Sequence, residues 1–152
     1  MEQQFSWPIT EVSVAAPAGW LSKQSWTVFA PDGQANVIAS SEPISSHLDT
    51  EQYAHAQGDL LWREFPQFHE HSIESINLGP QRALLRDFEW WPPDGVKVRQ
   101  LQVYLASSGQ GFTATATTPA SNFPHVEQVL RATLSRVRFG PCVGSADWSA
   151  GA

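Results

Sequence analysis

Residues 99–118 read RQLQVYLASSGQGFTATATT, and this stretch decides the fold of the chain. Apolar and polar residues alternate on both sides of Ser108-Gly109, as they do in strands with two different faces. A two-residue turn that contains glycine is a common connection between hairpin strands. We therefore expect two long antiparallel strands joined at Ser108-Gly109.

Pairing across this turn divides the hairpin and its neighbouring strand into two faces. One face is small and apolar and suits a packed helix; it comprises Leu85, Leu101, Val103, Leu105, Phe112, Ala114 and Ala116. The other face mixes aromatic rings with amides and hydroxyls; it comprises Phe88, Trp90, Val96, Val98, Gln100, Gln102, Tyr104, Thr113, Thr115 and Thr117.

This mixed face is a candidate partner surface. Its candidate binding residues are Phe88, Trp90, Val98, Gln100, Gln102, Tyr104, Thr113, Thr115 and Thr117. A solvent-facing surface would contain more Lys and Glu, and a buried one fewer Gln and Thr. The alternative is an ordinary half-exposed sheet face, because Thr and Tyr favour strands. On the first reading, Gln102→Glu or Tyr104→Ala leaves thermal stability nearly intact and abolishes partner capture.

Charge pairing suggests the register of the preceding hairpin. If Trp90 lies opposite Val96, then Glu89 faces Lys97 and Asp87 faces Arg99, so this register forms two pairs of opposite charge. Both carboxylates are then structural charges and not a paired general acid and base.

The remaining elements follow from periodicity and turn residues. The expected strands are residues 10–16, 25–30 and 35–41, which form a meander, and 68–78, 81–91, 96–106 and 111–117. Asp49 and Gln52 predict a capping box for a first helix that ends at Pro66. Asn122 is expected to cap a second helix, with Pro124 in its first turn.

The apolar positions of the two helices indicate which sides face the sheet. They are Tyr53, Ala56, Leu60 and Leu61 in the first helix, and Phe123, Val126, Val129, Leu130, Leu134 and Val137 in the second. The order of elements indicates an α+β fold with a curved antiparallel sheet of six to seven strands and two main helices. We expect one domain over residues 1–139 and a flexible tail over 140–152.

Composition excludes several classes of protein. A net charge of −6 argues against a nucleic-acid binder, which needs a basic surface. Cys142 is the only cysteine, so an intrachain disulfide is impossible. The first residues do not resemble a signal peptide, and no apolar run reaches the roughly 20 residues of a membrane span. We expect a cytoplasmic protein that does not insert into membranes, unless an export segment precedes this sequence.

Catalytic and metal-binding motifs are not found in the sequence. It contains no G-x-S-x-G elbow and no phosphate-binding glycine loop. His69 and His71 share one strand face, but Glu70 points to the other, so a zinc site is poorly supported. We expect no catalytic residue, no metal and no cofactor, and therefore a binding protein that is not an enzyme.

Short motifs along the chain carry a family resemblance. Residues 16–20 read APAGW, 24–29 QSWTVF, 88–91 FEWW and 98–102 VRQLQ, and FTATAT at 112–117 precedes an amphipathic helix. As far as Phe139, the chain resembles the DcrB/PsbP-like superfamily, and most of all the bacterial effector-associated chaperones of type VI secretion. The residues after Phe139 are an addition, and residues 34–41 lack the acidic ending expected of the family.

The resemblance implies a PsbP-like α/β/α sandwich. It also implies a homodimer that holds the apolar N-terminal segment of a secreted effector, with the mixed sheet face as the contact surface. The superfamily also contains lipoproteins and photosystem-associated proteins, and the lack of a signal peptide argues against both. The alternative function is a small-ligand-binding or envelope-associated accessory domain of the DcrB/LpqN/PsbP-like superfamily.

Overall fold

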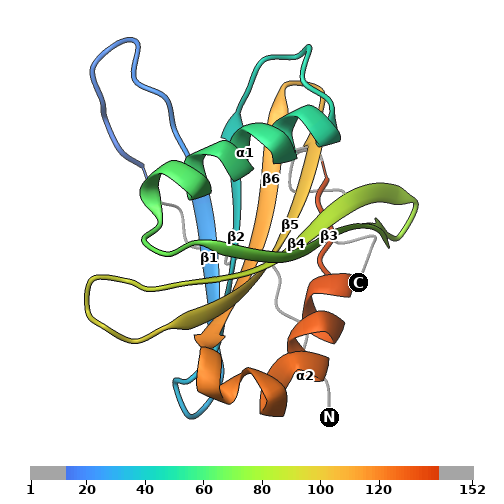
Figure 1. Cartoon of the computed structure of the whole chain (residues 1–152). Coiled ribbons are helices and arrows are strands. Elements are labelled where there is room, and N and C mark those ends of the chain that lie inside the picture. Colours follow the sequence, from blue (N-terminus) through green and yellow to red (C-terminus); the bar gives the residue numbers. More distant parts are fainter. Residues whose placement is uncertain (1–12, 141–152) are drawn as a thin grey trace.

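Six strands form one antiparallel sheet, and an α-helix covers each of its faces (Figure 1). The computed structural model describes residues 13–140. Its elements are β1 (Gln24–Phe29), β2 (Asn36–Pro43), α1 (Thr50–Glu64), β3 (His69–Leu78), β4 (Gln81–Trp90), β5 (Val98–Ser107), β6 (Gln110–Pro119) and α2 (Phe123–Ser135). The strand order across the sheet is β1-β2-β6-β5-β4-β3. The predicted α+β class with a curved antiparallel sheet is confirmed.

The β5–β6 hairpin has the predicted turn and register. Ser108 and Gly109 both adopt positive φ angles, 50° and 79°, which is the backbone of the tight turn that matches the twist of two antiparallel strands. The predicted pairs are Leu105 with Phe112, Val103 with Ala114 and Leu101 with Ala116, and all three are present. The division of these strands into two faces is therefore correct.

Helix α2 packs on the small apolar face. Phe123, Leu130 and Leu134 are buried against this face, and they belong to one core cluster with Leu85, Leu101, Val103, Ala114 and Ala116. Val129 is exposed, contrary to the prediction, because α2 presents only a narrow stripe to the sheet. Asn122 occupies the predicted N-cap position, but its backbone is helical and it makes no side-chain cap bond; its side-chain amide donates instead to the Thr118 hydroxyl at 3.1 Å.

Helix α1 lies on the mixed face. The predicted capping box is present, with the Asp49 carboxylate accepting from the backbone N–H of Gln52 at 2.8 Å. The buried side of α1 differs from the prediction, since Ala56 and Leu60 are exposed. The residues that face the sheet include Tyr53, Ala54, Gly58 and Leu61. Small residues in the middle of the helix let the sheet approach its backbone closely.

The β4–β5 register differs from the predicted one by two residues. Glu89 lies opposite Arg99 and Asp87 opposite Leu101. Both predicted ion pairs still form, but diagonally: Lys97 Nζ lies 3.3 Å from Glu89 and Arg99 Nε 2.6 Å from Asp87. Long basic side chains reach across the diagonal of a strand pair. A shift of two residues preserves both faces, so their assignment stands.

The predicted N-terminal meander is wrong in its first strand. Residues 13–16 are not in a strand, and β2 pairs with β6 on the side where a third meander strand was expected. Residues 10–12 and the predicted tail from 141 onward, with Cys142, lie outside the described residues. Within residues 13–140, no helix has the length and apolar character needed to span a bilayer.

Candidate binding groove

A groove of about 260 Å³ lies between the C-terminal half of α1 and the mixed face of the sheet. Leu61 and Phe65 of α1 form one wall, and Ile38 of β2 lies on the sheet side. The complete lining is Lys23, Ile38, Ser40, Leu61, Phe65, Phe88, Gln100, Gln102, Thr113, Thr115 and Thr117. The walls are therefore apolar, while the floor carries amides and hydroxyls.

The structure brings most of the predicted partner-binding residues together in this groove. Six of them line it: Phe88, Gln100, Gln102, Thr113, Thr115 and Thr117. The other three, Trp90, Val98 and Tyr104, do not. Sequence reasoning therefore found the floor of the groove and missed its walls, which come from α1 and β2.

Two of the predicted binding residues are buried in the core, although Phe88 also contributes to the groove lining. Tyr104 is 0% exposed and Phe88 1% exposed. Tyr104 packs under Tyr53 and Ala54 of α1, and Phe88 packs with Leu61 and Phe68. The expectation that Tyr104→Ala leaves thermal stability nearly intact is therefore wrong, because α1 covers this half of the mixed face. The groove is what remains open.

The floor of the groove is a row of side-chain hydrogen bonds between β5 and β6. Gln100 Nε2 donates to Thr117 Oγ1 at 2.8 Å, and Gln102 Nε2 donates to Thr115 Oγ1 at 2.9 Å. Behind this row, Trp90 Nε1 donates to Gln100 Oε1 at 2.7 Å. Buried polar groups are stable when they are paired in this way, and pairing fixes their orientation.

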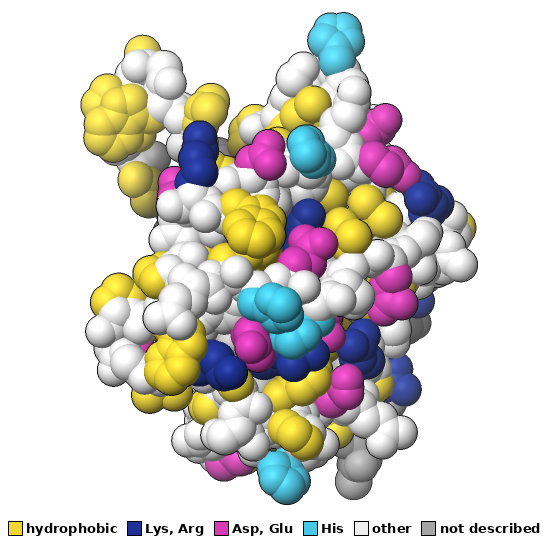
Figure 2. All heavy atoms as spheres, in the orientation of Figure 1, with side chains coloured by type: hydrophobic (Ala, Val, Ile, Leu, Met, Phe, Trp, Pro, Cys, Tyr) yellow, Lys and Arg dark blue, Asp and Glu magenta, His cyan; other side chains and the backbone are white. Residues whose placement is uncertain are grey.

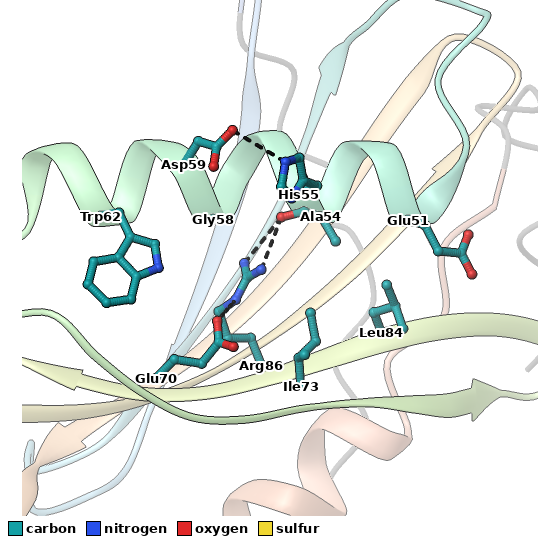
Figure 3. Close-up of a pocket in the computed structure, with 10 residues that line it drawn as sticks. All are labelled: Glu51, Ala54, His55, Gly58, Asp59, Trp62, Glu70, Ile73, Leu84 and Arg86. Carbon is teal, nitrogen blue, oxygen red and sulfur yellow. Dashed lines mark hydrogen bonds and ion pairs between the residues drawn. The ribbon is translucent and has the colours of Figure 1, made fainter.

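Arg86 anchors the other end of the row from beneath α1 (Figure 3). Its guanidinium, with the side chain 6% exposed, donates to Tyr104 OH at 2.6 Å, to the Ala54 carbonyl at 3.2 Å and to Glu70 at 2.9 Å. Tyr104 OH in turn donates to Gln102 Oε1 at 2.5 Å. A continuous chain of donors therefore leads from Arg86 to the groove.

Glycine in the middle of α1 makes room for this guanidinium. A Cβ on Gly58 would lie 2.6 Å from Arg86 Nη2. Glycine is unfavourable inside a helix, so its presence here signals a close approach of another group. The sequence analysis assigned no role to Arg86; a glycine within a helical pattern was the available signal of its role.

A second hollow of about 420 Å³ lies between α1 and the strands β3 and β4, around Arg86 (Figure 3). Its lining includes three carboxylates, and each lies near a basic side chain. Glu70 pairs with Arg86 and Glu51 with Arg82, and Asp59 lies 3.7 Å from His55. The Glu51–Arg82 pair and the bonds from Arg86 to the Ala54 carbonyl join α1 to β4, and the Glu70–Arg86 pair joins β3 to β4, so we regard this hollow as structural.

Burial keeps both tyrosines of the chain protonated. It raises the pKa of Tyr104 to about 12, even though the nearby Arg86 charge and hydrogen bond act in the opposite direction. Burial, together with a hydrogen bond to Glu42, raises the pKa of Tyr53 above its ordinary value as well. The Tyr104 hydroxyl therefore remains a donor to Gln102 at neutral pH.

The opposite side of the sheet carries a charged cluster that joins β4, β5 and α2. Asp87 accepts from Arg99 at 2.6 and 3.0 Å and from Arg131 at 3.2 Å. Burial acts to raise the pKa of Glu89, but hydrogen bonds from Lys97 and His71 outweigh it and lower that pKa. Among residues 13–140, no three His, Cys, Asp or Glu side chains group to hold a metal ion.

Exposed apolar residues lie on the segment that leads into the groove. Trp20 and Leu21, which precede the groove residue Lys23, are 72% and 82% exposed. Figure 2 shows hydrophobic side chains on this projecting loop, at the upper left, apart from the mixed charges over α1 and β3. Large exposed apolar residues often mark a site of contact with a partner.

A family model described as DcrB matches residues 11–136, which cover the whole sheet and both helices. The chain belongs to the DcrB family. A search of curated proteins finds no match to this DcrB-family chain.

Two solved structures share the fold of this DcrB-family chain. One is PA94 of Pseudomonas aeruginosa, described as a protein of unknown function, with a TM-score of 0.63 and 20% identity over 83% of this chain and 90% of that one. The other is CyanoP, the PsbP of Synechocystis sp. PCC 6803, with a TM-score of 0.52 and 11% identity over 82% and 96%. At these identities the likeness establishes the fold, a PsbP-like sandwich.

Proposed function

We propose that this DcrB-family chain is a non-enzymatic binding protein that shields an apolar, transmembrane-type segment of a secreted partner. In this role it acts as a cytoplasmic chaperone or adaptor, and the partner is an effector of type VI secretion. The observation that carries the proposal is the groove: apolar walls from α1 and β2 above a floor of paired amides and hydroxyls.

The groove suits such a segment for two physical reasons. Its apolar walls remove side-chain surface of the segment from water, which stabilises the complex by about 25 cal/mol for each Å² of apolar surface buried. Its polar floor can meet the main-chain polar atoms of the segment, which would otherwise lose hydrogen bonds on leaving water. A volume of about 260 Å³ admits a few side chains, so we propose that the groove anchors part of the segment.

The rest of the segment requires further apolar surface. We propose that Trp20 and Leu21, on the exposed segment that precedes the groove residue Lys23, supply some of it, since large aromatic residues often dominate binding energy at interfaces. A second copy of the chain would supply more, so we include a homodimer in the proposal. Measurement of the molecular mass of the purified protein in solution, alone and with a partner, tests whether it forms this homodimer.

Co-expression with the products of neighbouring genes tests the proposal. We expect a partner with an apolar N-terminal segment to remain soluble and to co-purify with this chain. Ile38→Glu places a charge in the groove wall and should abolish capture. Ile73→Glu is the matched control, because Ile73 has a similar exposure, 43% against 37%, and lies outside the groove.

Thermal denaturation of both variants shows whether each is folded. The proposal fails if no neighbour's apolar segment is captured, or if the two variants reduce capture equally. Binding of only a small amphiphile, with no protein segment captured, would instead favour the alternative of a small-ligand-binding accessory domain.

A further inference from the structure

Polar contacts fasten the N-terminal half of α1 to the sheet. Thr50 Oγ1 accepts from the backbone N–H of Ala106 at 3.1 Å, and the Ala54 carbonyl accepts from the Arg86 guanidinium at 3.2 Å. Tyr53 OH donates to a carboxylate of β2 at 2.9 Å. Hydrogen bonds depend on both distance and direction. These contacts with β2, β4 and β5 therefore hold this half of the helix in one position.

The C-terminal half of α1, residues 59–64, is held differently. Among the contacts of the described residues, no hydrogen bond or ion pair joins this half to the sheet. Leu61 instead packs with the Phe88 ring, and Phe65, directly after the helix, lies with its ring centroid 3.9 Å from that of Trp90. Apolar contacts of this kind are not directional, so another apolar group can replace them.

Both ends of this half allow it to move away from the sheet. Gly58 lies at its start, and glycine has more backbone freedom than any other residue. Beyond its end, a backbone hydrogen bond returns the chain to the end of β4, from the N–H of Trp91 to the Pro66 carbonyl at 3.0 Å. Pro66 is exposed, so water can replace this bond when it breaks.

The groove is narrow for the segment that we propose it holds. A helix with its side chains is about 10–12 Å across, whereas a volume of about 260 Å³ admits only a few side chains. Leu61 and Phe65 form the wall on the α1 side. Displacement of this wall widens the groove and uncovers the aromatic rings of β4 that lie beneath it.

We propose that residues 59–65 form a movable wall, which covers the aromatic rings of β4 in the free protein and swings aside when an apolar segment enters. The inference rests on the proposed function and deepens it, because it describes how access to the groove is regulated. Apolar side chains of the segment replace the contacts that Leu61 and Phe65 give up. In the free protein the wall keeps the same apolar surface out of water, and the N-terminal half of α1 stays fastened in both states.

Distances between pairs of spin labels test this movement on the full chain. Cys142→Ala first removes the only cysteine. One label is placed at Gln128→Cys on α2, which covers the opposite face of the sheet, so the label senses movement of α1 away from that sheet. The second label is placed at Arg63→Cys in the wall or, as the matched control, at Ala56→Cys in the fastened half. All three positions are exposed.

The occupant in this experiment is a soluble carrier protein that bears an N-terminal segment of about 20 leucine and alanine residues, the length of a membrane span. We expect its binding to lengthen the distance between positions 63 and 128 by at least about 3 Å, a fraction of a helix diameter, and to leave that between 56 and 128 unchanged. A carrier without the segment should change neither distance. An unchanged 63–128 distance in the complex overturns the inference. Equal lengthening from both positions also overturns it, because α1 would then move as a whole.

Variants of the free protein test the wall without any partner. Leu61→Ala removes part of the contact with Phe88 and should extend the 63–128 distribution to longer distances, with no change in the 56–128 distribution. Phe65→Leu serves the same purpose if thermal denaturation shows that Leu61→Ala is unfolded. An unchanged 63–128 distribution in the folded variant overturns the inference. Capture of an apolar segment without movement of the wall leaves the proposed function in place, whereas movement of the wall in these variants without any capture supports the wall and contradicts the proposed function.

Discussion

Gly58→Ala should destabilise this protein, although the same change stabilises most helices. Alanine is favoured over glycine inside a helix by about 1 kcal/mol. Here the new Cβ would lie 2.6 Å from Arg86 Nη2 and 3.0 Å from its Cζ, so the guanidinium has to move. The Ala54 carbonyl then loses its charged donors, and the loss of such hydrogen bonds lowers the stability of the fold by about 1.5–3 kcal/mol.

The two effects leave a net loss of about 0.5–2 kcal/mol in the free energy of unfolding. Urea denaturation followed by circular dichroism measures it. Ala56→Gly, at an exposed position of the same helix, is the control and should lose about 1 kcal/mol from propensity alone. In an Arg86→Gln background, Gly58→Ala should become stabilising. Stabilisation by Gly58→Ala in the otherwise unmodified chain would refute this account of Arg86.

Three further predictions concern the core and its charges. The chain has two tyrosines, Tyr53 and Tyr104, and both of their pKa values are raised, that of Tyr104 to about 12. Tyrosinate absorbance should therefore not rise near pH 10 while circular dichroism shows a folded protein. A normal tyrosine titration near pH 10 would show that the rings are open to water. The lowered pKa of Glu89 means that its ion pairs stabilise the fold above the unfolded pKa of a glutamate, near 4.5, and that this stability is lost as pH falls through the lower folded value. Glu89→Gln should thus be less stable than the unmodified protein at pH 7 and equally stable in strong acid, as denaturation at several pH values would show, and a difference that persists in acid would contradict it. Tyr104→Ala should lose about 3–5 kcal/mol of stability, because it empties a fully buried site, and near-native thermal stability would place the ring on the surface after all.

The alternation of residues 99–118 was enough to predict the β5–β6 hairpin, its turn and its two faces. A two-residue turn fixes the register, and the side-chain period of two then fixes each face. For the same reason five of the predicted binding residues, all from this hairpin, share one groove. The β4–β5 register was missed because diagonal and direct charge pairs fit the same alternation, and shifts of two residues leave the pattern unchanged.

What covers a sheet face cannot be derived from the strands alone. The mixed face contains Tyr104 and Thr115 at equivalent positions of the pattern, yet α1 buries the first and leaves the second at the groove. That difference depends on the rotation of α1, which Ala54, Gly58 and the buried Arg86 set through contacts distant in sequence. The walls of the groove are long-range features for the same reason.

Photo-cross-linking from the groove tests the central claim most directly. A photoreactive amino acid replaces Ile38 in one variant and Ile73 in another, each co-expressed with a neighbouring gene product that has an apolar N-terminal segment. We predict cross-links from position 38 to that apolar segment, and none from position 73. Cross-links from position 73 alone, or from neither position while the two proteins co-purify, would contradict the claim that this groove holds the segment.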